Sequence, residues 1–112
     1  MAVAKPKKAK DLIRYAPPDT KIPARLGGGI LKELHEQDRK TGELRRYALA
    51  YINPAIFSGD NGRVLGYDNA HGFPHRHFMG TVTREPTLSW REIRARFEQE
   101  WQEIATRYVK GE

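Results

Sequence analysis

The sequence GYDNAHGFPHRHF, residues 66–78, places a turn between two apolar, strand-like runs. Gly72 and Pro74 favour a reversal, because glycine accepts positive φ and proline fixes φ at a value found in turns. Three of the four histidines of the chain fall inside this segment, next to Asp68. No other segment concentrates groups that exchange protons near neutral pH. This stretch therefore predicts a pair of strands and a candidate site at the turn between them.

Working outward from this turn, alternation of apolar residues predicts an antiparallel sheet. Tyr47, Leu49 and Tyr51 alternate with small residues, which is typical of a half-buried strand. The pair Asn61-Gly62 favours a hairpin turn, because both positions accept positive φ. Four strands are expected, over residues 30–38, 44–52, 63–68 and 75–83.

Residues 89–110 carry the pattern of an amphipathic helix. Ser89 followed by Glu92 forms a capping-box signature, and Gly111 suits the helix end. Apolar side chains then recur at steps of three and four along one stripe: Trp90, Ile93, Phe97, Trp101, Ile104 and Tyr108. The expected fold class is α+β: a four-stranded antiparallel sheet with one long C-terminal helix packed on one face and a basic N-terminal arm.

The N-terminal region differs from the rest in charge and composition. Residues 1–25 hold seven Lys or Arg and two Asp, so they carry most of the net charge of +6. Pro17-Pro18 prevents a continuous helix, and the glycines at 27–29 favour flexibility. Residues 1–29 are therefore expected to form a basic, Pro/Gly-rich arm that is loosely attached or binds nucleic acid, and residues 30–112 a single α+β domain.

Composition excludes several classes of protein. The chain has no cysteine, which excludes disulfides, thiolate catalysis and cysteine-based zinc sites. No apolar run approaches the roughly 18 residues that a membrane span requires. The basic N-terminus is not followed by an apolar segment, as it would be in a secretory signal. We therefore expect a cytoplasmic protein with no membrane association.

Strand alternation predicts which side chains share a face. His75 and His77 are expected on the face away from the helix, with Phe78 and Val82 beneath the helix. Asp68 and Asn69 are expected to stand near His71 and His75 across the turn. The remaining histidine, His35, is expected to be an ordinary exposed strand residue.

Three interpretations of this polar patch remain open. In the first, two imidazoles act as acid and base on an RNA phosphodiester without metal, Arg76 contacts the phosphate and Asp68 orients an imidazole. In the second, His75 and His77 bind a divalent metal together with Asp68 or His71. In the third, the histidines are surface residues and Asp68 and Asn69 only brace the turn.

The run VLGYDNAHG at 64–72, the His-Arg-His segment at 75–77 and the Trp- and Phe-rich C-terminal helix together resemble the TumE family. These proteins are classed as toxins of type II toxin–antitoxin modules, encoded beside a helix-turn-helix antitoxin. The resemblance covers roughly residues 30–108, and it implies that residues 30–38 form a strand. This chain departs from the family pattern at Phe73-Pro74 and in its basic arm.

The resemblance implies a toxin whose partners are RNA, by analogy with other small toxins, and a cognate helix-turn-helix antitoxin. From the residues themselves, the expected catalytic groups of such a ribonuclease are His75, His77, His71 and Asp68. Arg76, Asn69 and Tyr67 are the expected substrate-binding groups, with no metal and no cofactor. The alternative is a non-catalytic nucleic-acid- or protein-binding module with a structural histidine patch.

Overall fold

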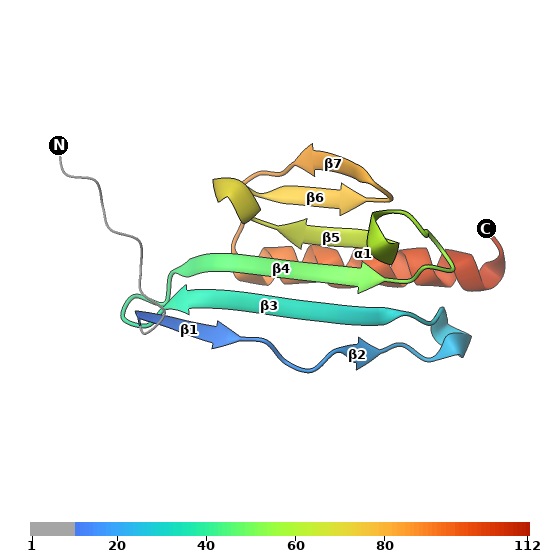
Figure 1. Ribbon diagram of the computed structural model, residues 1–112, viewed down its shortest axis with the longest axis horizontal. Coiled ribbons are helices and arrows are strands. Elements are labelled where there is room, and N and C mark those ends of the chain that lie inside the picture. The colour runs from blue at the N-terminus through green and yellow to red at the C-terminus, as the bar shows by residue number, and fades with distance from the viewer. Residues whose placement is uncertain (1–10) are drawn as a thin grey trace.

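The computed structural model describes residues 11–112, which form an α+β fold with one antiparallel sheet and one long C-terminal helix (Figure 1). The sheet has seven strands in the order β1-β3-β4-β5-β6-β7, with β2 also paired to β3. The strands are β1 Leu12–Tyr15, β2 Thr20–Lys21, β3 Ile30–Asp38, β4 Leu44–Ile52, β5 Arg63–Asp68, β6 His75–Phe78 and β7 Thr81–Arg84. The helix α1 spans Trp90–Lys110 and lies behind the sheet in Figure 1.

The predicted fold class is confirmed in its α+β layout, but the prediction of four strands is wrong. The expected strand at 75–83 is two strands, β6 and β7, joined by a tight turn at Met79-Gly80. Both turn residues have positive φ, 46° and 84°, which reverses the chain as a two-residue hairpin does. The reversal pairs Val82 with His77, so Val82 lies on the histidine face and is 54% exposed. Its expected place beneath the helix is therefore wrong.

The described part of the expected arm contributes the two other strands. β1 pairs antiparallel with the far end of β3, and β2 pairs with its beginning. Pro17 and Pro18 lie between them, where the missing proline N–H prevents continuous pairing. Residues 12–21 thus form one interrupted edge of the sheet, which composition alone did not reveal. Residues 1–10 lie outside the described residues.

The helix begins and ends where its sequence predicts. The Ser89 hydroxyl accepts a hydrogen bond from the Glu92 backbone N–H at 3.2 Å, and it donates to the Glu92 carboxylate at 3.0 Å. Gly111 ends the helix with φ of 75°. Ile93, Phe97 and Ala105 are buried from the helix side, whereas Tyr108 is 44% exposed. The apolar stripe therefore reaches the core over most of the helix but not in its last turn.

The two faces of the sheet differ because only one is covered by α1. Tyr47, Leu49, Tyr51, Leu65 and Tyr67 are buried in the core shared with the helix. The opposite face, here called the open face, carries the alternate residues of the same strands. From β3 to β7 it presents Lys32, Leu34, Glu36, Arg46, Ala48, Ala50, Gly66, Asp68, His75, His77, Val82 and Arg84. No helix in the described part of the chain combines the length and apolar character that a membrane crossing requires.

Candidate active site

Asp68 on β5 stands between the two histidines of β6, as expected. The pairing register places Asp68 opposite His75 and Gly66 opposite His77. His77 Nε2 donates to Asp68 Oδ2 at 2.7 Å, and His75 Nδ1 lies 3.4 Å from Asp68 Oδ1. The rings of His75 and His77 are 6.1 Å apart between centroids, and both lie on the open face. The structure thus brings these three predicted residues together.

Both nitrogens of His77 are occupied by neighbouring side chains. Arg63 Nη2 donates to His77 Nδ1 at 3.1 Å, and a guanidinium can only donate. His77 Nδ1 must therefore be the accepting nitrogen, while Nε2 carries the proton given to Asp68. Arg63 is itself held by Asp60, whose Oδ2 accepts from Arg63 Nε at 2.8 Å. Neither nitrogen of His77 is free to exchange a proton with a substrate.

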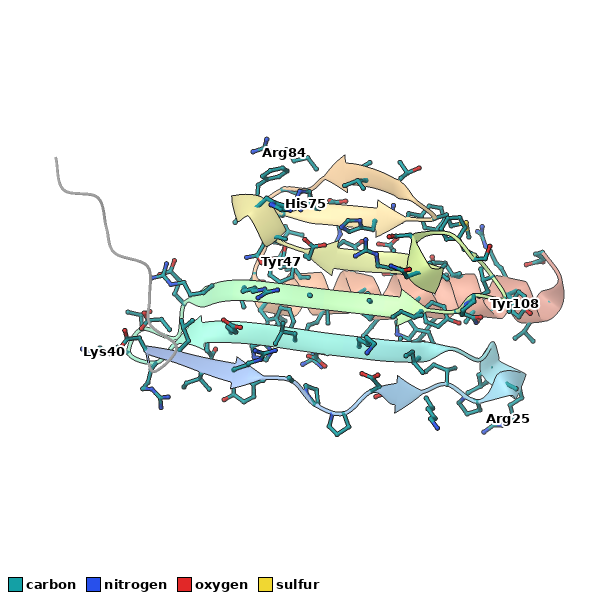
Figure 2. All side chains as sticks on the ribbon, viewed as in Figure 1. Arg25, Lys40, Tyr47, His75, Arg84 and Tyr108 are labelled. Atoms are coloured by element: carbon teal, nitrogen blue, oxygen red, sulfur yellow. The ribbon has the colours of Figure 1, made fainter. Side chains whose placement is uncertain are left out.

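His75 is 9% exposed, and its ring nitrogens differ from those of His77 in their partners. Its Nδ1 is close enough to Asp68 for electrostatic attraction, but it has no hydrogen-bonding partner. Nε2, on the other side of the ring, has no protein partner within residues 11–112. Phe73 lies against the ring with centroids 4.2 Å apart, and Arg84 covers Phe73 at 4.6 Å. Figure 2 shows His75 and Arg84 beside the turn that joins β5 to β6.

A depression of about 420 Å³ lies over these side chains on the open face. It is lined by Arg46, Tyr47, Ala48, Arg63, Asp68, Ala70, His71, His75, His77 and Val82. Asp68 is the one carboxylate in the lining, and two guanidiniums and three imidazoles surround it. Such a composition favours an anionic ligand, because the cationic donors outnumber the acceptors.

Arg63 and Asp60 were missed by the sequence interpretation, and Gly66 explains how Arg63 reaches the site. A Cβ on Gly66 would lie 2.9 Å from Arg63 Cδ, so a side chain at position 66 would occupy the space that Arg63 uses. Arg63 therefore crosses the open face over Gly66 to reach His77. A glycine at an internal strand position signals such a close approach, but it does not name the partner.

Arg76 and Tyr67 lie on the helix face, not beside the histidines. Arg76 donates to both carboxylate oxygens of Glu100 on α1, one contact being Nε to Oε2 at 3.1 Å, and the Tyr67 hydroxyl donates to the same carboxylate. Burial raises the pKa of Tyr67 to about 12, helped by its bond to Glu100. The geometric condition for Arg76 to contact a phosphate beside the histidines is therefore not met.

At the turn between β5 and β6, Asp68 and Asn69 form hydrogen bonds to the backbone, whereas His71 is exposed. Asn69 accepts from the Tyr47 backbone N–H at 3.0 Å and donates to the Arg45 carbonyl at 3.0 Å, so its amide fixes the turn to β4. Asp68 Oδ1 also accepts from the Ala70 N–H at 2.9 Å. His71 is exposed at φ of 64°, a left-handed conformation that is uncommon for a residue with a Cβ. Its ring centroid lies 6.5 Å from that of His75.

His35 is not the exposed residue expected. Its ring stacks on Tyr15 at 4.6 Å and contacts Trp90 at 4.6 Å, on the helix face. Burial lowers its pKa, with Arg94 adding to the effect and Glu33 opposing it. His35 therefore joins β1, β3 and α1, and it lies on the other side of the sheet from the remaining histidines.

Within residues 11–112, no group of three His, Asp or Glu side chains converges as metal ligands do. Comparisons of the chain with protein-family models, with curated proteins and with solved structures returned no match in any of the three.

Proposed function

We propose that the chain is the toxin of a type II toxin–antitoxin module and that it cleaves RNA on its open face without a metal. The observation that carries the enzymatic part is the position of Asp68 beside His75, next to a depression lined with Arg46 and Arg63. The toxin assignment is supported by the resemblance of residues 64–77 to the TumE family. A helix-turn-helix antitoxin and the cytoplasm are the corresponding partner and location.

His75 is the proposed general base, because its Nε2 is free and its Nδ1 faces a carboxylate. Nε2 removes the proton of a 2′-hydroxyl, and the 2′-oxygen forms a bond to phosphorus as the bond to the 5′-oxygen breaks. His71, as imidazolium, donates a proton to the leaving 5′-oxygen. The products are a 2′,3′-cyclic phosphate and a 5′-hydroxyl, so atoms and charges balance without a co-reactant.

His77 is the proposed positioning residue for Asp68, not the second acid–base group. Its Nε2–H fixes one carboxylate oxygen at 2.7 Å, which leaves the other oxygen directed at His75. Arg46 and Arg63 are the proposed phosphate contacts in place of Arg76, since they line the depression and Arg76 does not. Guanidiniums in such positions stabilise the extra negative charge that develops on the phosphorane.

The enzymatic proposal is tested with purified protein and a single-stranded RNA in the presence of a chelator. His75→Gln is expected to lower the cleavage rate by at least 100-fold, the usual size of an acid–base contribution. His35→Gln, which removes the imidazole from the opposite face, is the matched control and should cleave like the wild type at pH 7.5. Equal rates for wild type and His75→Gln would remove His75 from the mechanism.

The toxin assignment is tested separately by induced expression in cells. Wild-type protein should arrest growth and degrade RNA, His75→Gln should do neither, and the product of the adjacent helix-turn-helix gene should restore growth. Growth that is unaffected by the wild type would contradict the assignment whatever the purified enzyme does.

The second candidate function is a binding module, favoured by the saturated hydrogen bonding of His77. A network in which Asp60, Arg63, His77 and Asp68 satisfy one another is what a structural brace requires. A binder should lose affinity steeply with salt and show no cleavage. Because β1 and β2 lie within residues 12–21, truncation to test the basic region should remove residues 1–10 only.

A further inference from the structure

The open face continues from the depression along β4 as a floor of small side chains, with Ala48 lining the depression and Ala50 next along the strand. Ala48 lies in the cross-strand row of Asp68 and His75, and Ala50 lies in the row of Gly66 and His77. β3 borders this floor on one side with Lys32, Leu34 and Glu36, and β5 borders it on the other with Asp68 and with Arg63, which crosses over Gly66. The two borders are two strand spacings apart, about 10 Å between backbones. The low floor between taller side chains suits an extended, narrow ligand.

Two groups at this floor lack the partners that a purely structural surface would supply. His75 lines the depression, and its Nε2, on the side of the ring away from Asp68, has no hydrogen-bonding partner within residues 11–112. Arg46 is exposed, and its guanidinium has no hydrogen bond or ion pair within the described residues. An imidazole nitrogen and a guanidinium that both lack protein partners at one depression are available to a ligand.

From this arrangement we propose that the open face binds one strand of RNA lengthwise along β4, by its backbone rather than by its bases. This inference rests on the proposed function, because it specifies which form of RNA the same site binds. Arg46 and the row of Ala50 are four residues apart on β4, about 13 Å at the usual rise per residue. Arg46 and Arg63, which crosses that row, therefore contact different phosphates.

The aromatic side chains near the depression offer little surface on which bases could stack. Single-stranded nucleic acid is usually held by bases stacked on exposed aromatic rings. Here the Phe73 ring contacts both the His75 ring and the Arg84 guanidinium, and Tyr47 is 5% exposed. The phenyl ring of Phe73 is engaged and the phenol ring of Tyr47 is buried, so we expect affinity that is tolerant of sequence and dominated by phosphate contacts.

The reaction itself also favours a single strand. Attack by a 2′-oxygen requires that the oxygen, the phosphorus and the leaving 5′-oxygen come into line, and the sugar–phosphate backbone of a duplex restrains that rotation. A single strand turns freely at one nucleotide while its neighbours stay bound. One of Arg46 and Arg63 would hold the scissile phosphate beside His75, and the other would hold the neighbouring phosphate.

The experiment measures binding with a fluorescent 2′-O-methyl RNA, which lacks the attacking hydroxyl, as a single strand and as a duplex of the same sequence. Wild-type protein should bind the single strand at least ten-fold tighter than the duplex. Ala50→Leu, which raises the floor, should weaken single-strand binding at least ten-fold. Thr81→Leu adds a comparable side chain on the other face of the sheet, at an exposed position of β7, and should bind like the wild type.

A second variant keeps the test decisive if Ala50→Leu is poorly folded. Arg46→Gln alters an exposed side chain, and it should reduce the slope of log affinity against log salt by about one. Equal affinity for single strand and duplex, or an unchanged salt slope in Arg46→Gln, would overturn the proposal. Cleavage of unmodified RNA is scored apart: binding along β4 without cleavage contradicts the proposed function alone, whereas cleavage without single-strand preference contradicts this inference alone.

Discussion

Gly66 controls the site at the scale of single residues, through the space it leaves for Arg63. Its φ is not in the left-handed region, so alanine is compatible with the backbone there. The added methyl group would meet Arg63 Cδ at 2.9 Å and the Leu49 carbonyl oxygen at 3.3 Å. The flexible arginine is the group that can move, and it would leave His77.

We therefore predict that Gly66→Ala disconnects Arg63 from His77 with little effect on folding. The free energy of unfolding should fall by only about 1.5 kcal/mol, the lower value for a hydrogen bond that involves a charged group. The imidazole ¹⁵N shifts of His77 should change, because Nδ1 loses its donor. Arg63→Gln serves as the reference variant and should give the same shifts. Wild-type shifts in Gly66→Ala would contradict the arrangement of Arg63 over Gly66.

Sequence reasoning succeeded for residues whose position follows from alternation. The shared face of His75 and His77 follows from the two-residue period of a strand, and the nearness of Asp68 follows from the short turn. The roles of Arg63 and Arg76 depend instead on contacts between elements. Alternation along β6 places Arg76 on the helix face. There it contacts the carboxylate of Glu100, which the sequence around Arg76 does not predict.

At the scale of elements, the ring stack of Tyr15, His35 and Trp90 attaches the edge strand to the body of the protein. β1 is four residues long, and its partner strand β3 carries His35 between the other two rings. A charged imidazole in this stack would be poorly solvated, which is why the pKa of His35 is lowered. The attachment of β1 is thus coupled to pH.

We predict that acid weakens the fold through His35. Below pH 6.5, the ordinary value for histidine, the unfolded chain binds a proton that the folded chain resists, so the free energy of unfolding falls as the pH drops. His35→Phe keeps an aromatic ring and should be less sensitive between pH 7.5 and 5.5 in urea unfolding. His71→Asn, which removes an exposed imidazole, should retain the wild-type sensitivity. Identical pH profiles for wild type and His35→Phe would exclude His35 as the source.

Helices and strands were predicted well where the spacing of apolar residues keeps one period without interruption. The helix carries its cap, its apolar stripe and its terminal glycine in the sequence, and the structure has all three, except that the stripe is exposed in the last turn. The β6–β7 hairpin was missed because methionine is an unusual residue at a left-handed turn position. β1 and β2 were missed because their pairing depends on β3, while their composition resembles that of a tail.

At the scale of the whole molecule, the ionic contact between Arg76 and Glu100 joins the two layers in a partly buried position. Glu100 on α1 receives hydrogen bonds from Tyr67 on β5 and Arg76 on β6, and its side chain is 26% exposed. Burial alone would raise the pKa of Glu100, but the bonds from Arg76 and Tyr67 together lower it. The carboxylate therefore stabilises the packing of the helix on the sheet.

We predict that Glu100→Gln lowers the free energy of unfolding by about 1–3 kcal/mol at neutral pH, because Arg76 loses its counter-charge. The stabilisation by Glu100 is present above pH 4.5, its ordinary value, and is lost as the pH falls through the lowered pKa. The difference between wild type and variant should accordingly shrink in acid. Glu103→Gln, which removes the charge of an exposed carboxylate beside Gln99, should stay within about 0.5 kcal/mol of wild type. A constant difference from pH 7 to 3.5 would contradict an ionic role.

The single helix covering one side of the sheet has a consequence for the history of such a protein. In each strand, the residues that face the helix are selected for folding. The alternate residues, on the open face, are selected for the ligand or partner that this face binds. A lineage could exchange the residues of the uncovered side and acquire new targets while its interior stayed the same. Among related sequences, variable and conserved positions should therefore alternate along β4, β5 and β6.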